Sequence, residues 1–165
     1  MKNITVHHLA LAGLFGALIL LLTMWPSIRI GRGYIHLGDT FVYLAAVVLP
    51  MPYSIMAAAT GAALADLLLG GAVWAPASVI IKGLSVLFFC YRPEKPLCLR
   101  NFIAPIFGAV LCIGGYYLYE AVIYGNYTVP LAGIPGNILQ TMSSGILYIL
   151  VLSAIRNRIY KSAVK

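Results

Sequence analysis

The sequence predicts an all-α integral membrane protein, a bundle of six transmembrane helices with both termini in the cytoplasm. Hydrophobic residues fill 62% of the 165 positions and charged residues only 9%, a composition typical of membrane proteins and unlike that of soluble domains. Six apolar segments alternate with polar connections, and Lys and Arg gather in alternate connections. Because six spans of roughly 20 residues use about 120 positions, residues 1–165 are predicted to form a single six-helix membrane domain.

Each predicted helix is an apolar run bounded by proline, glycine or charge. The first run ends at Met-Trp-Pro without a small-x-small cleavage site, so we expect a spanning helix and not a cleaved signal peptide. The second run is short, about 16 Å of helix, and spans only with its flanks or in a locally thin bilayer. The predicted segments are 8–27, 39–49, 52–70, 76–91, 102–124 and 134–159.

The connections between these segments differ in charge. With six helices, eight cations lie on the side of the two termini, whereas the other side carries only Arg29 and Arg32. Because cytoplasmic loops are enriched in Lys and Arg, this bias predicts a multi-pass protein with cytoplasmic termini. The eight cations are Lys2, Arg92, Lys95, Arg100, Arg156, Arg158, Lys161 and Lys165.

Four ionisable residues lie inside the predicted segments, each within roughly 10 Å of a helix end. Asp39 opens the second segment and Lys82 follows the start of the fourth, whereas Asp66 and Glu120 lie near the ends of the third and fifth. In the oriented bundle all four ends are outside. Since charged groups in a bilayer usually face a cavity or each other, this common depth predicts a polar pocket open to the outside.

Neighbouring polar and aromatic residues extend the predicted pocket. Ser78 and Lys82 share one helix face, and the polar residues of the sixth segment form a stripe at helical spacing. The glycine-rich connection 28–38 and the connection 70–76 supply aromatic rings that close over a ligand. The predicted substrate-binding residues are Tyr34, His36, Asp39, Asp66, Trp74, Lys82, Tyr116, Glu120, Asn137, Gln140 and Thr141.

Purely structural interpretations remain open for the same residues. Lys82 pairs with Asp66 or Glu120 in one of them, and the polar residues of the sixth segment bond between helices. Trp74 and the tyrosines equally suit anchoring at the membrane interface. In the first segment, small residues at i and i+4 predict either a partner surface or internal packing; these are Ala12, Gly13, Gly16 and Ala17.

Other function classes lack their motifs. No nucleophile with a base, no metal-ligand spacing and no phosphate-binding loop occurs, so we expect no catalytic residue, metal or cofactor, and any ATP hydrolysis belongs to a partner. The cations are dispersed, which excludes nucleic acid as a partner. Three cysteines are read as packing residues.

Three segments resemble the substrate-binding S components of energy-coupling factor (ECF) vitamin importers. They are YIHLGD (34–39), AALADLL (62–68) and WAPASVIIKG (74–83), in this order within six helices. The resemblance implies a binding subunit in the bacterial cytoplasmic membrane that joins a transmembrane coupling (T) protein and two ATPases. It implies that the small residues of the first helix meet the T protein.

The identity of the ligand follows less directly from the sequence. The predicted lining suits a pyridine or pyrimidine alcohol, so the sequence favours pyridoxine or hydroxymethylpyrimidine, with pantothenate and riboflavin as further possibilities. A second hypothesis is a small membrane enzyme or assembly factor that acts on a lipid or envelope precursor through Asp66, Lys82 and Glu120. A third is a passive bundle whose polar stripes serve only assembly.

Overall fold

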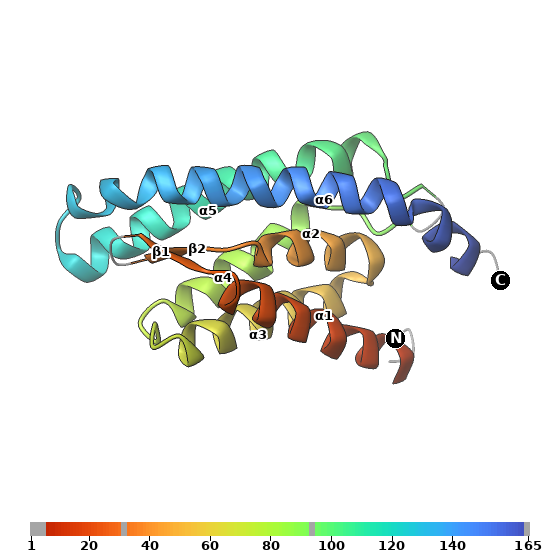
Figure 1. The fold of residues 1–165 in the computed structure, drawn as a ribbon, viewed down its shortest axis with the longest axis horizontal. Helices are drawn as coiled ribbons and strands as arrows, with labels where there is room; N and C mark the ends of the chain where they lie inside the picture. Colours follow the sequence, from red (N-terminus) through yellow and green to blue (C-terminus); the bar gives the residue numbers. More distant parts are fainter. Residues whose placement is uncertain (1–5, 31–32, 93–94, 164–165) are drawn as a thin grey trace.

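Six α-helices, two short 3-10 helices (η1 and η2) and one short hairpin form the part of the chain that the structure describes (Figure 1). The computed structural model describes residues 6–30, 33–92 and 95–163, and the side chains of residues 29, 30, 33, 34 and 157–163 lie outside that description. Both termini lie at one end of the bundle and the hairpin at the other. The elements are α1 (Val6–Met24), β1 (Ile28–Ile30), β2 (Gly33–Ile35), α2 (Gly38–Val48), α3 (Met51–Leu68), α4 (Ala75–Ser85), η1 (Val86–Phe88), α5 (Leu99–Tyr124), η2 (Val129–Gly133) and α6 (Ile134–Ala163).

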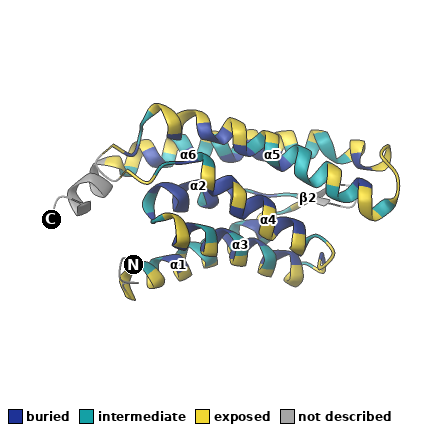
Figure 2. Cartoon of the chain, turned by 180° about the vertical axis from the view of Figure 1, so that it is seen from behind, coloured by how far each residue is buried: buried dark blue, intermediate teal, exposed yellow. Residues whose placement is uncertain are grey.

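The short helix α2 forms the centre of the bundle. Nine of its 11 residues are buried, and it contacts α1, α3, α4 and α6. Figure 2 shows it as mainly dark blue among helices whose outer faces are yellow. The long helices expose apolar side chains, such as Val110 at 67% and Val122 at 79% on α5, as lipid-facing helices do. The polar α2 start is therefore enclosed by protein.

Four helices are long and apolar enough to cross a membrane, namely α1, α3, α5 and the stretch Val129–Arg156 that includes α6. Two shorter apolar helices, Gly38–Val48 and Ala75–Phe88, complete the bundle. The predicted helical bundle and the shortness of its second helix are therefore confirmed. The number of spans and the cytoplasmic side of the termini stay predictions.

The hairpin is the exception to the predicted all-α fold. β1 and β2 pair antiparallel, with Ile28 opposite Ile35 and Ile30 opposite Gly33. Each strand has three residues, which is too short for its alternation to stand out from a glycine-rich loop. A Cβ on Gly136 would lie 3.6 Å from Cγ1 of Ile35, so the hairpin packs on the start of α6.

Helices α1 and α3 approach closely at two glycines. A Cβ on Gly61 would lie 2.6 Å from the Gly16 carbonyl oxygen and 3.0 Å from Cβ of Ile19. The small residues of α1 are thus divided: Ala12 is buried and Gly16 faces α3, whereas Gly13 and Ala17 are exposed. Both predicted roles of this stripe, packing and an outward surface, are geometrically available.

At the end of the bundle near the termini, Asn101 fixes the connection between α4 and α5. Its side chain is fully buried; Oδ1 accepts the Cys90 N–H at 2.7 Å, and Nδ2 donates to the carbonyls of Cys90 and Pro96, each at 2.9 Å. Tyr148 of α6 donates to the Asn101 carbonyl at 3.0 Å. One residue therefore holds three segments together.

The close contact between α1 and α3 at Gly61 can be tested by measuring how a larger residue there changes protein stability. We expect Gly61→Ala to lower the free energy of unfolding by about 1–3 kcal/mol, because the added methyl overpacks the contact. Gly13→Ala is the matched control, since a Cβ there meets nothing within 4 Å. Thermal unfolding in detergent measures both variants, and an unchanged Gly61→Ala protein contradicts the close packing.

Candidate functional site

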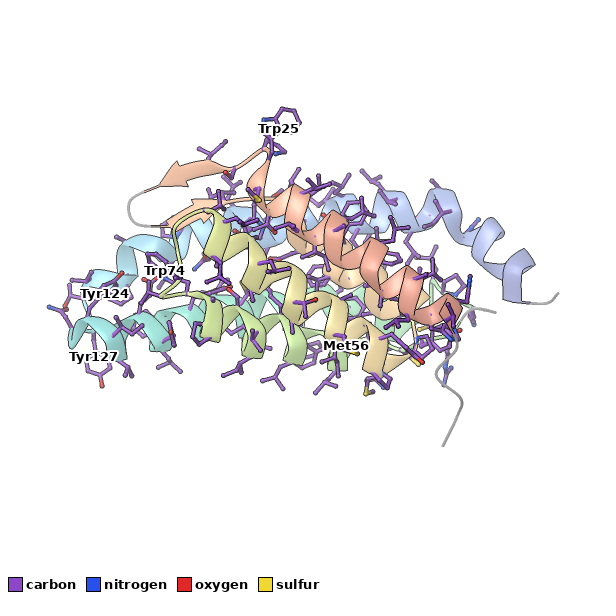
Figure 3. The ribbon with its side chains drawn as sticks, turned by 90° about the horizontal axis from the view of Figure 1, so that it is seen from below. Trp25, Met56, Trp74, Tyr124 and Tyr127 are labelled. Atoms are coloured by element: carbon purple, nitrogen blue, oxygen red, sulfur yellow. The ribbon has the colours of Figure 1, made fainter. Side chains whose placement is uncertain are left out.

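A cavity opens at the end of the bundle opposite the termini. It holds about 570 Å³ of empty space, counting the part open to solvent. In Figure 3, Trp74 lies at the same end as Tyr124 and Tyr127, and Trp25 projects away from the bundle. Each of the six α-helices contributes to the walls, together with two connections. The lining residues are Ile19, Thr23, His36, Asp39, Val42, Ala62, Asp66, Trp74, Ser78, Lys82, Tyr116, Glu120, Asn137 and Gln140.

A buried ion pair forms the floor of this site. Lys82 Nζ of α4 lies 2.6 Å from Asp39 Oδ1 at the start of α2, and Gln140 Nε2 of α6 donates to Asp39 Oδ2 at 3.0 Å. Lys82 Nζ also lies 3.5 Å from Cys112 Sγ and 5.4 Å from the centre of the Tyr116 ring. Lys82 and Asp39 are only 3% and 1% exposed.

The observed partner of Lys82 corrects the structural alternative in the sequence analysis. That alternative paired Lys82 with Asp66 or Glu120, but the ion pair among the described residues joins Lys82 to Asp39. Sequence position puts all four groups near one end of the bundle, but Glu120 lies beside Trp74, eight residues and about 12 Å of helix before Lys82. The helices α3 and α5, which carry Asp66 and Glu120, also lie beside α4, so adjacency of helices alone does not select the partner.

A polar seam joins the start of α4 to the end of α5. Ser78 Oγ and the Tyr116 hydroxyl share a hydrogen bond of 2.6 Å. Trp74 Nε1 donates to Glu120 Oε1 at 3.0 Å, and the Tyr119 hydroxyl donates to the carbonyl of the residue before Trp74 at 2.6 Å. These three bonds close the side wall of the cavity between the two helices.

His36 lies between the hairpin and α2, with its ring held against the backbone. The Gly38 N–H donates to His36 Nδ1 at 3.1 Å, so the ring carries its proton on Nε2. Burial lowers the pKa of His36 to about 4, with Asp39 opposing this shift and Lys82 adding to it. A Cβ at Gly38 would collide with Thr23 Oγ1, which is why glycine starts α2. His36 is therefore a neutral hydrogen-bonding group.

Nine of the eleven predicted binding residues line the one cavity. Thr141 is buried beside it, and its hydroxyl donates to the carbonyls of Asn137 and Ile138 in its own helix. The side chain of Tyr34 lies outside the described residues. The nine that the structure brings together are His36, Asp39, Asp66, Trp74, Lys82, Tyr116, Glu120, Asn137 and Gln140.

Five lining residues were not among the predicted binding residues. Ser78 stands on the predicted polar face of the fourth segment, and Thr23 is the last polar residue of the first helix, so both carried a signal. The apolar lining residues carried none, because nothing distinguishes them from packing residues in the sequence. They are Ile19, Val42 and Ala62.

The charges of the lining define the chemistry that the cavity accommodates. It contains three carboxyl groups and one ammonium group, which already pairs with Asp39. An anionic ligand thus meets no unpaired cation among the lining residues, and an uncharged ligand meets hydroxyl, amide and indole groups. No cluster of described His, Cys, Asp or Glu residues is suited to hold a metal ion.

A second concave surface lies between the outer faces of α1 and α3. It is apolar and contains the predicted partner residues of α1 together with small and apolar residues of α3. Its lining residues are Leu9, Ala12, Gly13, Gly16, Ala17, Leu20, Met56, Ala57, Thr60, Gly61 and Leu64. Small side chains on both helices allow another helix to approach closely.

Removing one member of the ion pair leaves a buried unpaired charge. We expect Lys82→Met to lower the free energy of unfolding by about 3–5 kcal/mol in the ligand-free protein. The double variant Lys82→Met/Asp39→Asn should lose less than the sum of the two single variants, because no charge remains unpaired. Thermal unfolding in detergent measures this coupling, and additive losses contradict it.

Because the His36 ring is buried in its neutral form, we expect the free energy of unfolding to fall in mild acid. The unfolded chain binds a proton near pH 6.5, whereas the folded ring does so only near pH 4, so stability falls as pH drops between these values. The contribution is at most about 3 kcal/mol. His36→Gln should flatten the pH dependence of thermal unfolding in this window. His7→Gln, at an exposed histidine, should not; equal slopes in all three proteins contradict the assignment.

Comparison with known proteins supports a common fold. A solved structure of the S component of a bacterial ECF transporter superimposes with a TM-score of 0.69 at 20% sequence identity. The match covers 93% of this chain and 97% of that one, and at this identity it shows the fold alone. No curated protein sequence matches the chain.

Sequence comparison identifies the family. The family model described as ECF-type riboflavin transporter, S component, matches residues 3–157, which is nearly the whole chain. Such S components are substrate-binding subunits of vitamin transporters and are not enzymes, so the resemblance found in the sequence is confirmed and the membrane-enzyme hypothesis is not favoured. The chain therefore belongs to the family of ECF-type riboflavin transporter S components.

Proposed function

We propose that this chain binds riboflavin in the cavity and delivers it to a T protein and two ATPases. The protein lies in the bacterial cytoplasmic membrane with the cavity facing outward. Riboflavin is one of the possibilities that the sequence left open, and the family description favours it over the pyridoxine and hydroxymethylpyrimidine that the sequence favoured. The residues of this chain support the proposal in three ways.

The observation that carries the proposal is the closed charge pair of Lys82 and Asp39. Because the one lining lysine is already neutralised at 2.6 Å, the cavity favours an uncharged ligand. Riboflavin is uncharged at neutral pH and combines a flat heteroaromatic ring with a chain of hydroxyl groups. Pantothenate carries a carboxylate that meets Asp66 and Glu120 in the same cavity, so repulsion disfavours it.

The distribution of lining groups suits the two parts of such a ligand. Trp74 provides a flat indole face on one wall, and aromatic rings prefer offset stacking at van der Waals distance. Asn137, one turn before Gln140 on α6, lines the cavity; its amide carries both donors and an acceptor for the carbonyl and imide groups of a ring edge. The remaining hydroxyl and carboxylate groups suit a polyol chain.

The proposed orientation in the membrane rests on the end of the bundle opposite the cavity, and the proposed partner contact rests on the outer faces of α1 and α3. Both termini and the connection between α4 and α5 lie at the end of the bundle away from the cavity (Figure 1). The connection and the first turn of α5 carry the exposed Arg92, Lys95 and Arg100, which favours an outward cavity by the positive-inside rule. The apolar surface between α1 and α3 provides Gly13 and Ala17 for contact with a T-protein helix. ECF S components work with such a protein and with ATPases, and the family membership supports the same assembly here.

Native mass spectrometry of the purified chain tests the ligand. We expect riboflavin either retained from the host or bound after addition, ahead of pyridoxine, hydroxymethylpyrimidine and pantothenate in the same panel. The double variant Asn137→Leu/Gln140→Leu should weaken riboflavin binding by at least about tenfold, because two amide groups leave the wall. Binding of another vitamin in preference to riboflavin contradicts the proposed ligand, and unchanged binding by the double variant contradicts the proposed site.

A further inference from the structure

Trp74 is held at two separate points of its indole ring. On one edge, Nε1 donates a hydrogen bond of 3.0 Å to Glu120 Oε1. On the other, a Cβ built on Gly71 would lie 3.2 Å from Cε3 and 3.7 Å from Cζ3 of the ring, so the ring packs against the Gly71 backbone. Contact at both edges fixes the two side-chain torsions and therefore the plane of the indole.

Glu120 reaches the indole from a different helix, and neighbouring bonds keep that helix in place. The Tyr119 hydroxyl of α5 donates to the carbonyl of Val73 at 2.6 Å. Val73 directly precedes Trp74 in the chain. One turn away, Ser78 and Tyr116 share a bond of the same length. The carboxylate of Glu120 is thus held beside the α3–α4 connection and bonds to Trp74, the last residue of that connection.

We propose that Glu120 is a positioning residue that acts through Trp74, and that the fixed indole is the wall on which a flat ring of the ligand stacks. The inference deepens the proposed function and rests on it. Glu120 Oε1 is used by the indole N–H, so the carboxylate contributes to affinity by orienting Trp74. A fixed ring loses less rotamer entropy on stacking than a mobile one.

The sequence provides a clean fluorescence reporter for this proposal. The chain has two tryptophans, and Trp25 is 78% exposed and projects away from the bundle (Figure 3). Trp25→Phe therefore leaves Trp74 as the single tryptophan without touching the cavity. All variants below are made in this background and purified in detergent.

The ligand-free arm measures the orientation of Trp74 by fluorescence anisotropy. We expect Glu120→Ala to lower the anisotropy because the indole loses one of its two contacts, and Glu120→Gln to restore it because the amide oxygen still accepts the N–H. Tyr119→Phe is the matched control, since it removes a neighbouring bond between the same segments. An unchanged Glu120→Ala protein, or an equal loss in Tyr119→Phe, overturns the positioning role.

The ligand arm is a double-mutant cycle on riboflavin affinity. Glu120→Ala should weaken binding by about tenfold when Trp74 is present, but by less than about twofold in Trp74→Phe, whose ring has no N–H to orient. Equal losses in the two backgrounds overturn the proposal, because Glu120 then contacts the ligand directly. If the unmutated protein binds no riboflavin, the proposed ligand fails, whereas the ligand-free arm still decides whether Glu120 positions Trp74.

Discussion

The rest of this structure depends on an ion pair enclosed in a protein that faces lipid. A buried charge without a partner is costly. Lys82 and Asp39 avoid this cost only while α4 and α2 keep their two side chains within hydrogen-bonding distance. Gln140 extends the constraint to α6. Three helices that are not consecutive in the sequence are therefore held in register at the floor of the cavity, where precise placement matters for binding.

The short α2 explains why there is a cavity above this pair. Eleven residues make about 16 Å of helix, roughly half of the hydrocarbon core of a bilayer. Because α2 starts only at Gly38, the space that a full-length helix would fill is left between α1, α3, α4, α5 and α6. The ends of these helices supply the walls, and the polar start of α2 supplies the floor. Around the rest of α2, buried apolar side chains pack together and fill the interior of the bundle.

Sequence reasoning identified the ends of the helices and the depth of the ionisable groups, and both follow from local rules. Proline, glycine and charge end apolar runs, and loop charge orients them, so the sequence alone predicts that Asp39, Asp66, Lys82 and Glu120 belong to one end of the bundle. The partner of Lys82 was not predictable, because α2, α3 and α5 all contact α4 and each carries a carboxylate near one end. Apolar lining residues such as Val42 could not be predicted from the sequence either, because a cavity wall and a packed core use the same residue types.

The same energetic contrast indicates which parts of the cavity can open. Separating Lys82 from Asp39 exposes two buried charges to an apolar environment and costs several kcal/mol. The connections at the cavity end are held by individual hydrogen bonds, such as that between Tyr119 and Val73, each with a net contribution of about 1 kcal/mol. Opening through the connections preserves the helix register that the ion pair enforces. The floor of the cavity therefore resists separation more strongly than the connections at its open end.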